Sequence, residues 1–99
     1  MATNPDFTQL YNHHEREVFA AVMDAAPDYP DIAISNDLLC DVACVALNRL
    51  PPRYIRHAVD FSFYLTEHER LEMDQGIVDA VAYAFNFVGA RMAMRAKQG

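Results

Sequence analysis

Residues 35–54 read SNDLLCDVACVALNRLPPRY, and they decide the fold because they contain one helix together with both of its ends. Ser35 is a favourable N-cap, and Asp37 lies in the first turn, where a carboxylate interacts with the positive end of the helix dipole. The Pro51–Pro52 pair cannot continue a helix and predicts an abrupt end near Leu50. Apolar residues cover more than half of the circumference, which predicts a central buried helix. These apolar residues are Leu38, Leu39, Val42, Val45, Ala46 and Leu50.

The chain before this helix predicts a second one. Asn12 is a good N-cap, Glu15 follows three residues later as in a capping box, and Pro27 ends the pattern. Its apolar stripe consists of Val18, Phe19, Val22 and Met23. Residues 28–34 include a further proline and predict an irregular loop, with a brief extended piece at residues 32–34.

After Pro52 the pattern changes. Val59, Phe61, Phe63 and Leu65 alternate with more polar residues, as in a β-strand that must pair with another segment or a partner subunit. Thr66 and Glu69 then form a second capping box, which opens a helix to about Arg95. Gly76 lies inside it and indicates a kink or a close approach, so the sequence leaves open whether one helix or two form there.

That last helix has two apolar stripes. One consists of Leu71, Val78, Val81, Phe85, Val88 and Met92, and the other of Met73, Ile77, Ala80, Ala84, Phe87 and Met94. A helix that is apolar on two sides needs two partners, commonly its own core and another subunit. Hydrophobic residues form 53% of only 99 residues, more than so small a chain can readily bury alone. We therefore predict a mostly α-helical single domain over residues 1–99, with three helices and an extended segment at 59–65, that forms a homodimer.

The net charge is −6, which argues against binding to nucleic acid or anionic membranes. The first six residues lack the features of a signal peptide, and no apolar run approaches the length of a membrane span, so we expect a cytoplasmic protein. Basic residues gather in two clusters, where a small anionic ligand could bind. These clusters are Arg49, Arg53 and Arg56, and Arg91, Arg95 and Lys97.

Catalytic and metal-binding motifs are missing. His14–Glu15 and His68–Glu69 begin like HExxH zinc motifs but lack the second histidine, and no phosphate-binding glycine loop or nucleophile elbow occurs. Cys40 and Cys44 lie four apart among apolar residues, which favours small core residues over a metal or redox pair. We expect no enzyme activity, no metal and no cofactor.

The segment after the central helix offers ligand-binding chemistry. Two prolines fix the direction of the chain just before Arg53, Tyr54 and Arg56. Arginine can bind phosphate or a guanine edge, and a tyrosine ring can stack on a base. The structural alternative is a turn in which arginine caps the helix and tyrosine packs on the core.

Residues 39–55, LCDVACVALNRLPPRYI, resemble the signature of the late-competence protein ComFB family, and the order of elements agrees along nearly the whole chain. The resemblance implies a small, helical, dimeric cytoplasmic regulator, and some members bind the cyclic dinucleotides c-di-GMP or c-di-AMP. Some also carry several cysteines before the signature helix, in a spacing that suggests structural zinc. Residues 29–38 contain no cysteine, so we predict no zinc here.

Two hypotheses from different classes follow. The first is a regulatory protein that binds a cyclic dinucleotide, c-di-GMP rather than c-di-AMP, and signals to a regulatory protein partner. The second is a protein-interaction module, a helical homodimer without a small-molecule ligand. Direct DNA binding is a third and weaker hypothesis because the chain is acidic. The predicted ligand-binding residues are Asn48, Arg49, Arg53, Tyr54, Arg56, His57, Arg91 and Arg95.

Overall fold

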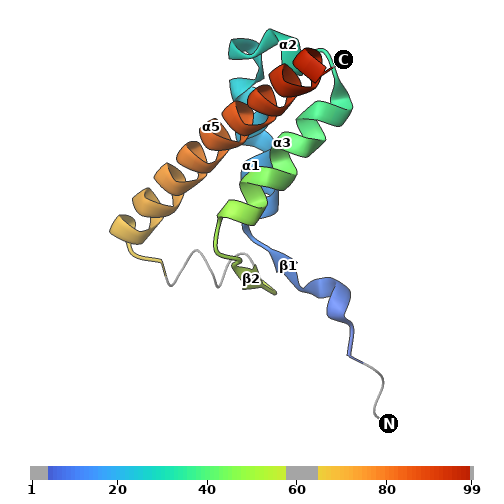
Figure 1. Cartoon of the computed structure of the whole chain (residues 1–99). Coiled ribbons are helices and arrows are strands. Elements are labelled where there is room, and N and C mark those ends of the chain that lie inside the picture. The colour runs from blue at the N-terminus through green and yellow to red at the C-terminus, as the bar shows by residue number, and fades with distance from the viewer. Residues whose placement is uncertain (1–4, 58–64, 99) are drawn as a thin grey trace.

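The computed structural model of the chain describes residues 5–57 and 65–98, and three long helices dominate it (Figure 1). These helices are α1 (His14–Ala25), α3 (Asn36–Arg49) and α5 (Glu67–Gln98). Helix α3 packs mainly against α5, and α1 contacts both. The prediction of a mostly α-helical fold with three principal helices is confirmed.

Helix α3 has the ends that its sequence predicts. The hydroxyl oxygen of Ser35 accepts a hydrogen bond from the backbone N–H of Leu38 at 3.2 Å, and the helix ends at Arg49. Leu50 is extended, as expected for a residue before proline. The core side of α3 consists of Leu39, Val42, Ala43 and Ala46.

A small antiparallel sheet closes the end of the molecule near the C-terminus of α3 (Figure 1). Its strands are β1 (Tyr11–Asn12) and β2 (Tyr54–Ile55), with Tyr11 opposite Ile55 and Asn12 opposite Tyr54. The side-chain oxygen of Asn12 accepts from the backbone N–H of His14 at 3.2 Å and from that of Arg53 at 3.1 Å. The N-cap residue of α1 is His13, one residue after the predicted Asn12, but the Asn12 side chain still binds the N–H of the first helical residue and also links β2 to the start of α1. The strand predicted at 59–65 lies outside the described residues except for Leu65.

The prediction of an extended piece at residues 32–34 is wrong. Between α1 and α3 the chain forms a 3-10 turn, η2 (Ala26–Asp28), and then the short helix α2 (Pro30–Ala33). Pro30 occupies the first helical position, where its missing N–H has no cost. The carbonyl of Tyr29 accepts from the N–H groups of Ile32 and Ala33, and the side chain of Ile32 is buried. Burial of Ile32 thus favours a helical turn over an open loop.

Helix α5 is one continuous helix of 32 residues, which Gly76 does not interrupt. The predicted cap is confirmed, because the hydroxyl oxygen of Thr66 accepts from the backbone N–H of Glu69 at 3.1 Å. The two predicted stripes are neighbours on the helix, and their adjoining halves form one buried face. The outer parts of the stripes remain exposed at Leu71, Val78, Phe87 and Met94. The buried face consists of Ile77, Ala80, Val81, Ala84, Phe85 and Val88.

The core lies where the three long helices meet. Phe85, Val18 and Val42 are its largest fully buried side chains, one from each helix. The ring of Phe85 stacks on that of Tyr29, with centroids 4.3 Å apart. By length and composition alone, α5 could also cross a membrane. A helix whose buried face packs against two other helices has the same apolar composition, and α5 is such a helix.

Candidate functional site

The end of the molecule near β2 holds four of the predicted ligand-binding residues: Arg53, Tyr54, Arg56 and His57. The backbone of Arg53 is structural, since its N–H donates to Asn12 and its carbonyl accepts from the N–H of His13 at 2.7 Å. Tyr54 is 69% exposed and does not pack in the core. Arg56 donates from Nε to Nε2 of His57 at 3.1 Å. At this end of the molecule, backbone hydrogen bonds hold the segment in place while its side chains remain exposed.

His14 lies beneath this end and is the buried polar residue of the described chain, at 6% exposure. Its Nδ1 has no hydrogen-bond partner among the described residues. Burial lowers the pKa of His14 below its ordinary value, and the nearby His13 and Arg53 side chains lower it further. A hydrogen bond with the backbone of Pro51 opposes this pKa shift but does not reverse it. His14 is therefore held neutral against the segment that contains the two prolines.

Arg91 and Arg95 lie elsewhere, in a pocket between α3 and α5. This pocket, which we call the α3/α5 pocket, has a volume of about 270 Å³. Helix α3 contributes Asp41 to it, and α5 contributes Phe87 beside the two arginines. The other lining residues are Leu38, Cys44, Val45, Val88 and Met92. Two cations, one carboxylate and one exposed ring thus meet in one small depression.

A row of aromatic and cationic groups runs along α5 from this pocket. Tyr83, Phe87, Arg91 and Arg95 are each four residues apart and so share one side of the helix. The rings of Tyr83 and Phe87 are 6.1 Å apart and inclined by 27°. The Cζ atom of Arg91 lies 5.8 Å from the centre of the Phe87 ring. From α3, the Cζ atom of Arg49 lies 3.8 Å from the centre of the Tyr83 ring, a cation–π contact.

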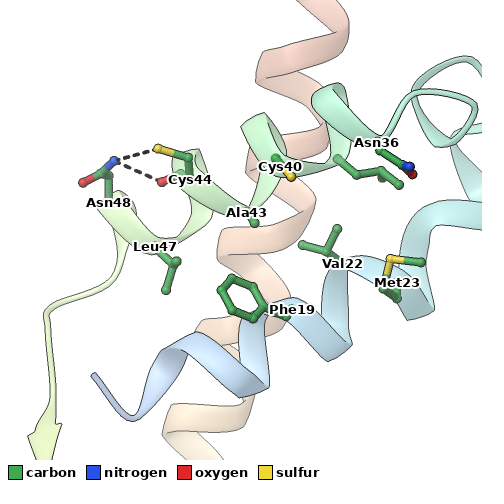
Figure 2. Close-up of a pocket in the computed structure, with 10 residues that line it drawn as sticks. Phe19, Val22, Met23, Asn36, Cys40, Ala43, Cys44, Leu47 and Asn48 are labelled. Carbon is green, nitrogen blue, oxygen red and sulfur yellow. Dashed lines mark hydrogen bonds between the residues drawn. The ribbon is translucent and has the colours of Figure 1, made fainter. Parts of the chain in front are cut away.

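Asn48 points neither to this row nor to β2. Its amide donates to the carbonyl oxygen of Cys44 at 3.0 Å and contacts the Cys44 sulfur at 3.6 Å, as Figure 2 shows. The side chain folds back on its own helix, at the edge of a groove between α1 and α3.

That groove, which we call the α1/α3 groove, is the largest depression described, at about 760 Å³ (Figure 2). Phe19 and Met23 of α1 line one side and remain 50% and 61% exposed. Cys40 and Cys44 of α3 line the other side and are exposed free thiols. The prediction that both cysteines are core residues is therefore wrong for a single chain. At 3.6 residues per turn, Cys40 lies about 110° and Cys44 about 150° around α3 from the centre of its buried face, so their apolar neighbours are those of the groove. The other lining residues are Val22, Asn36, Leu39, Ala43, Leu47 and Asn48.

The eight predicted residues thus fall into three groups within one chain. Arg49, Arg91 and Arg95 lie along the α3 and α5 surface, Asn48 lies at the edge of the α1/α3 groove, and residues 53–57 lie around β2. The sequence reasoning missed Tyr83, Phe87 and Asp41. The four-residue spacing of Tyr83, Phe87, Arg91 and Arg95 was a readable signal for the first two. No cluster of three or more potential metal ligands occurs among the described residues.

The fold and these surfaces define a class: a small helical domain of three packed helices, closed at one end by a two-stranded sheet. Its exposed surface includes an arginine–aromatic row and an apolar groove. The model of the family described as late competence development protein ComFB matches residues 11–92. The chain belongs to this family. A comparison with curated proteins and one with solved structures found no match.

Proposed function

We propose that this ComFB family member is a non-enzymatic cytoplasmic regulator that binds a cyclic dinucleotide, c-di-GMP rather than c-di-AMP, as a homodimer. The supporting observation is a set of three arginines, Arg49, Arg91 and Arg95, along the α3 and α5 surface. None of them forms an ion pair with a carboxylate among the described residues. In a chain of net charge −6, cations left without acidic partners are available for an anionic ligand.

The chemistry of this surface suits a nucleotide better than a simple anion. Guanidinium groups bind phosphate oxygens through paired hydrogen bonds, and aromatic rings stack on purine bases. The exposed rings of Tyr83 and Phe87 lie between Arg49 and Arg91, so both kinds of group occur together. The α3/α5 pocket is small enough for one base or one phosphate, so the rest of the ligand would lie over the exposed row.

Calorimetric titration of the purified protein with each dinucleotide at physiological salt tests this function. We expect micromolar or tighter binding of c-di-GMP, weakened at least tenfold by Arg91→Ala and little changed by Arg70→Ala. Arg70 is a matched control because it is an exposed arginine of α5 outside the α3/α5 pocket. A folded protein that binds neither nucleotide would contradict the proposal.

The second hypothesis, a protein-interaction module, is favoured by the α1/α3 groove. The exposed Phe19 and Met23 face two cysteines there, and contiguous exposed apolar side chains mark surfaces that another protein covers. A second copy of the chain is the occupant that we propose. If the folded protein is a dimer that binds no nucleotide, this second hypothesis replaces the first.

The segment around β2 gives a separate test of where the ligand binds. The double substitution Arg53→Ala and Tyr54→Ala removes the exposed groups that the sequence favoured. If nucleotide binding is lost while the fold is retained, β2 forms part of the binding surface. If only stability falls, this segment is structural, as its hydrogen bonds to Asn12 and His13 suggest.

A further inference from the structure

This inference rests on the nucleotide-binding function proposed above. The α3/α5 pocket contains a side chain that does not contribute to binding an anion. Asp41 is a carboxylate that lines the same pocket as Arg91 and Arg95. A carboxylate repels phosphate, so its presence weakens a pocket meant for phosphate only. If the pocket binds a nucleotide, the presence of Asp41 in it needs an explanation other than phosphate binding.

The hydrogen-bonding edges of purine bases supply that explanation. Guanine presents two acceptors, O6 and N7, on one edge, and arginine is their usual partner in proteins. Its N1–H and exocyclic amine are donors, and an ionised carboxylate is an acceptor without donors. A pocket with both arginine and aspartate therefore matches guanine on both sides.

Adenine does not match the same pocket. Its N1 is an acceptor without a hydrogen, and its exocyclic amine occupies the position of the guanine O6, where a guanidinium would meet another donor. A buried or partly buried polar group that lacks its partner costs free energy, which is how such sites reject the wrong base.

Phe87 provides the surface on which such a base could stack. Its ring is 39% exposed and lines the α3/α5 pocket, which Asp41 of α3 also lines. The guanidinium of Arg91 lies 5.8 Å from the ring centre, within reach of the edge of a stacked base. Tyr83, one turn earlier, extends the aromatic surface toward Arg49.

We propose that the α3/α5 pocket binds one guanine base of the dinucleotide, stacked on Phe87, and that Asp41 selects guanine over adenine by accepting from N1–H and the exocyclic amine. Arg91 and Arg95 bind O6, N7 and the adjoining phosphate. Residues 53–57 do not contact the base in this arrangement. The proposal rests on the nucleotide-binding function and assigns its specificity to one residue.

The test compares Asp41→Asn with Asp37→Asn in calorimetric titrations with c-di-GMP and with c-di-AMP. Asp37 is the matched control because it is an exposed aspartate of the same helix, outside the pocket, and its substitution changes the net charge equally. We expect Asp41→Asn to weaken c-di-GMP binding about 10- to 100-fold, the range of one good base contact. Binding of c-di-AMP should change less than about threefold, so the preference between the two nucleotides should collapse. Asp37→Asn should preserve the preference.

The outcomes separate this inference from the function on which it rests. If the wild-type protein binds c-di-GMP and Asp41→Asn behaves like Asp37→Asn, the base assignment is overturned and the receptor function stands. A wild-type preference for c-di-AMP overturns the assignment too. If the wild-type protein binds neither nucleotide, both proposals fail. Phe87→Leu, which keeps an apolar side chain of similar size, should lose affinity for both nucleotides, and circular dichroism should show that each variant is folded.

Discussion

Asn12 illustrates how much one polar side chain contributes and how much of it the sequence reveals. Its role at the start of α1 follows from a local pattern, an N-cap residue before an apolar stripe. Its hydrogen bond to the backbone of Arg53 joins residues 41 positions apart, and no local pattern predicts such a contact. Single residues were therefore predictable in their local roles and not in their long-range ones.

The buried neutral His14 predicts a pH dependence of stability. Because folding lowers its pKa, the unfolded chain binds the proton more readily, so stability falls as the pH drops below the ordinary value of about 6.5. One such group changes the free energy of unfolding by at most about 1.4 kcal/mol per pH unit. Thermal unfolding between pH 8 and pH 5 should show this decline.

A histidine on the surface is the control for His14. His14→Gln should flatten the decline below pH 6.5, whereas His68→Gln should leave it, because the His68 side chain is 81% exposed. If both variants follow the wild-type curve, the decline comes from other groups.

At the scale of elements, the three long helices follow from capping residues, prolines and apolar periodicity. Ser35, Thr66 and the Pro51–Pro52 pair mark ends that the structure reproduces. The sequence misjudged α2, because Pro30 can begin a helix as readily as it ends one. It also misjudged the stripes of α5, since periodicity gives the spacing of apolar residues but not which of two adjoining faces becomes buried.

Gly76 of α5 gives a stability prediction at this scale. A Cβ atom there would lie 3.8 Å from Cδ2 of Leu50, an ordinary van der Waals distance, so alanine fits without movement. Alanine in a helix interior is favoured over glycine by about 0.5–1 kcal/mol. Gly76→Ala should therefore raise Tm by about 2–8 °C in a domain of this size.

The reverse substitution on the same helix is the control. Ala82→Gly, at an exposed position of α5, should lower Tm by a similar amount. A decrease in Tm for Gly76→Ala would instead mean that a kink or close approach at Gly76 matters in the working protein.

At the scale of the whole molecule, apolar side chains of one helix remain uncovered in a single chain. Phe19 and Met23 of α1 are 50% and 61% exposed, and they line the α1/α3 groove together with the exposed Cys40 and Cys44 of α3. The apolar α1/α3 groove is the surface that we expect a second copy to cover.

Sedimentation velocity tests this assembly. Phe19→Glu places a charge in the α1/α3 groove and should convert a dimer to monomers, with the helical content unchanged. Phe7→Glu is the matched control, because Phe7 is 70% exposed on η1 (Phe7–Gln9), outside the groove. A dimer that survives Phe19→Glu would place the interface elsewhere.

Helix α3 separates the two surfaces, and Cys44 lines both the α1/α3 groove and the α3/α5 pocket. An α-helix with its side chains is only about 10 Å across, so a nucleotide in the pocket and a second subunit in the groove would contact adjoining sides of one helix, with Cys44 between them. Thermodynamic linkage then makes the two events reciprocal: any factor by which the nucleotide strengthens dimerisation is the factor by which dimerisation tightens the nucleotide. The apparent affinity for the messenger would then depend on how much of the protein the cell makes, and expression level would set the sensitivity of the response.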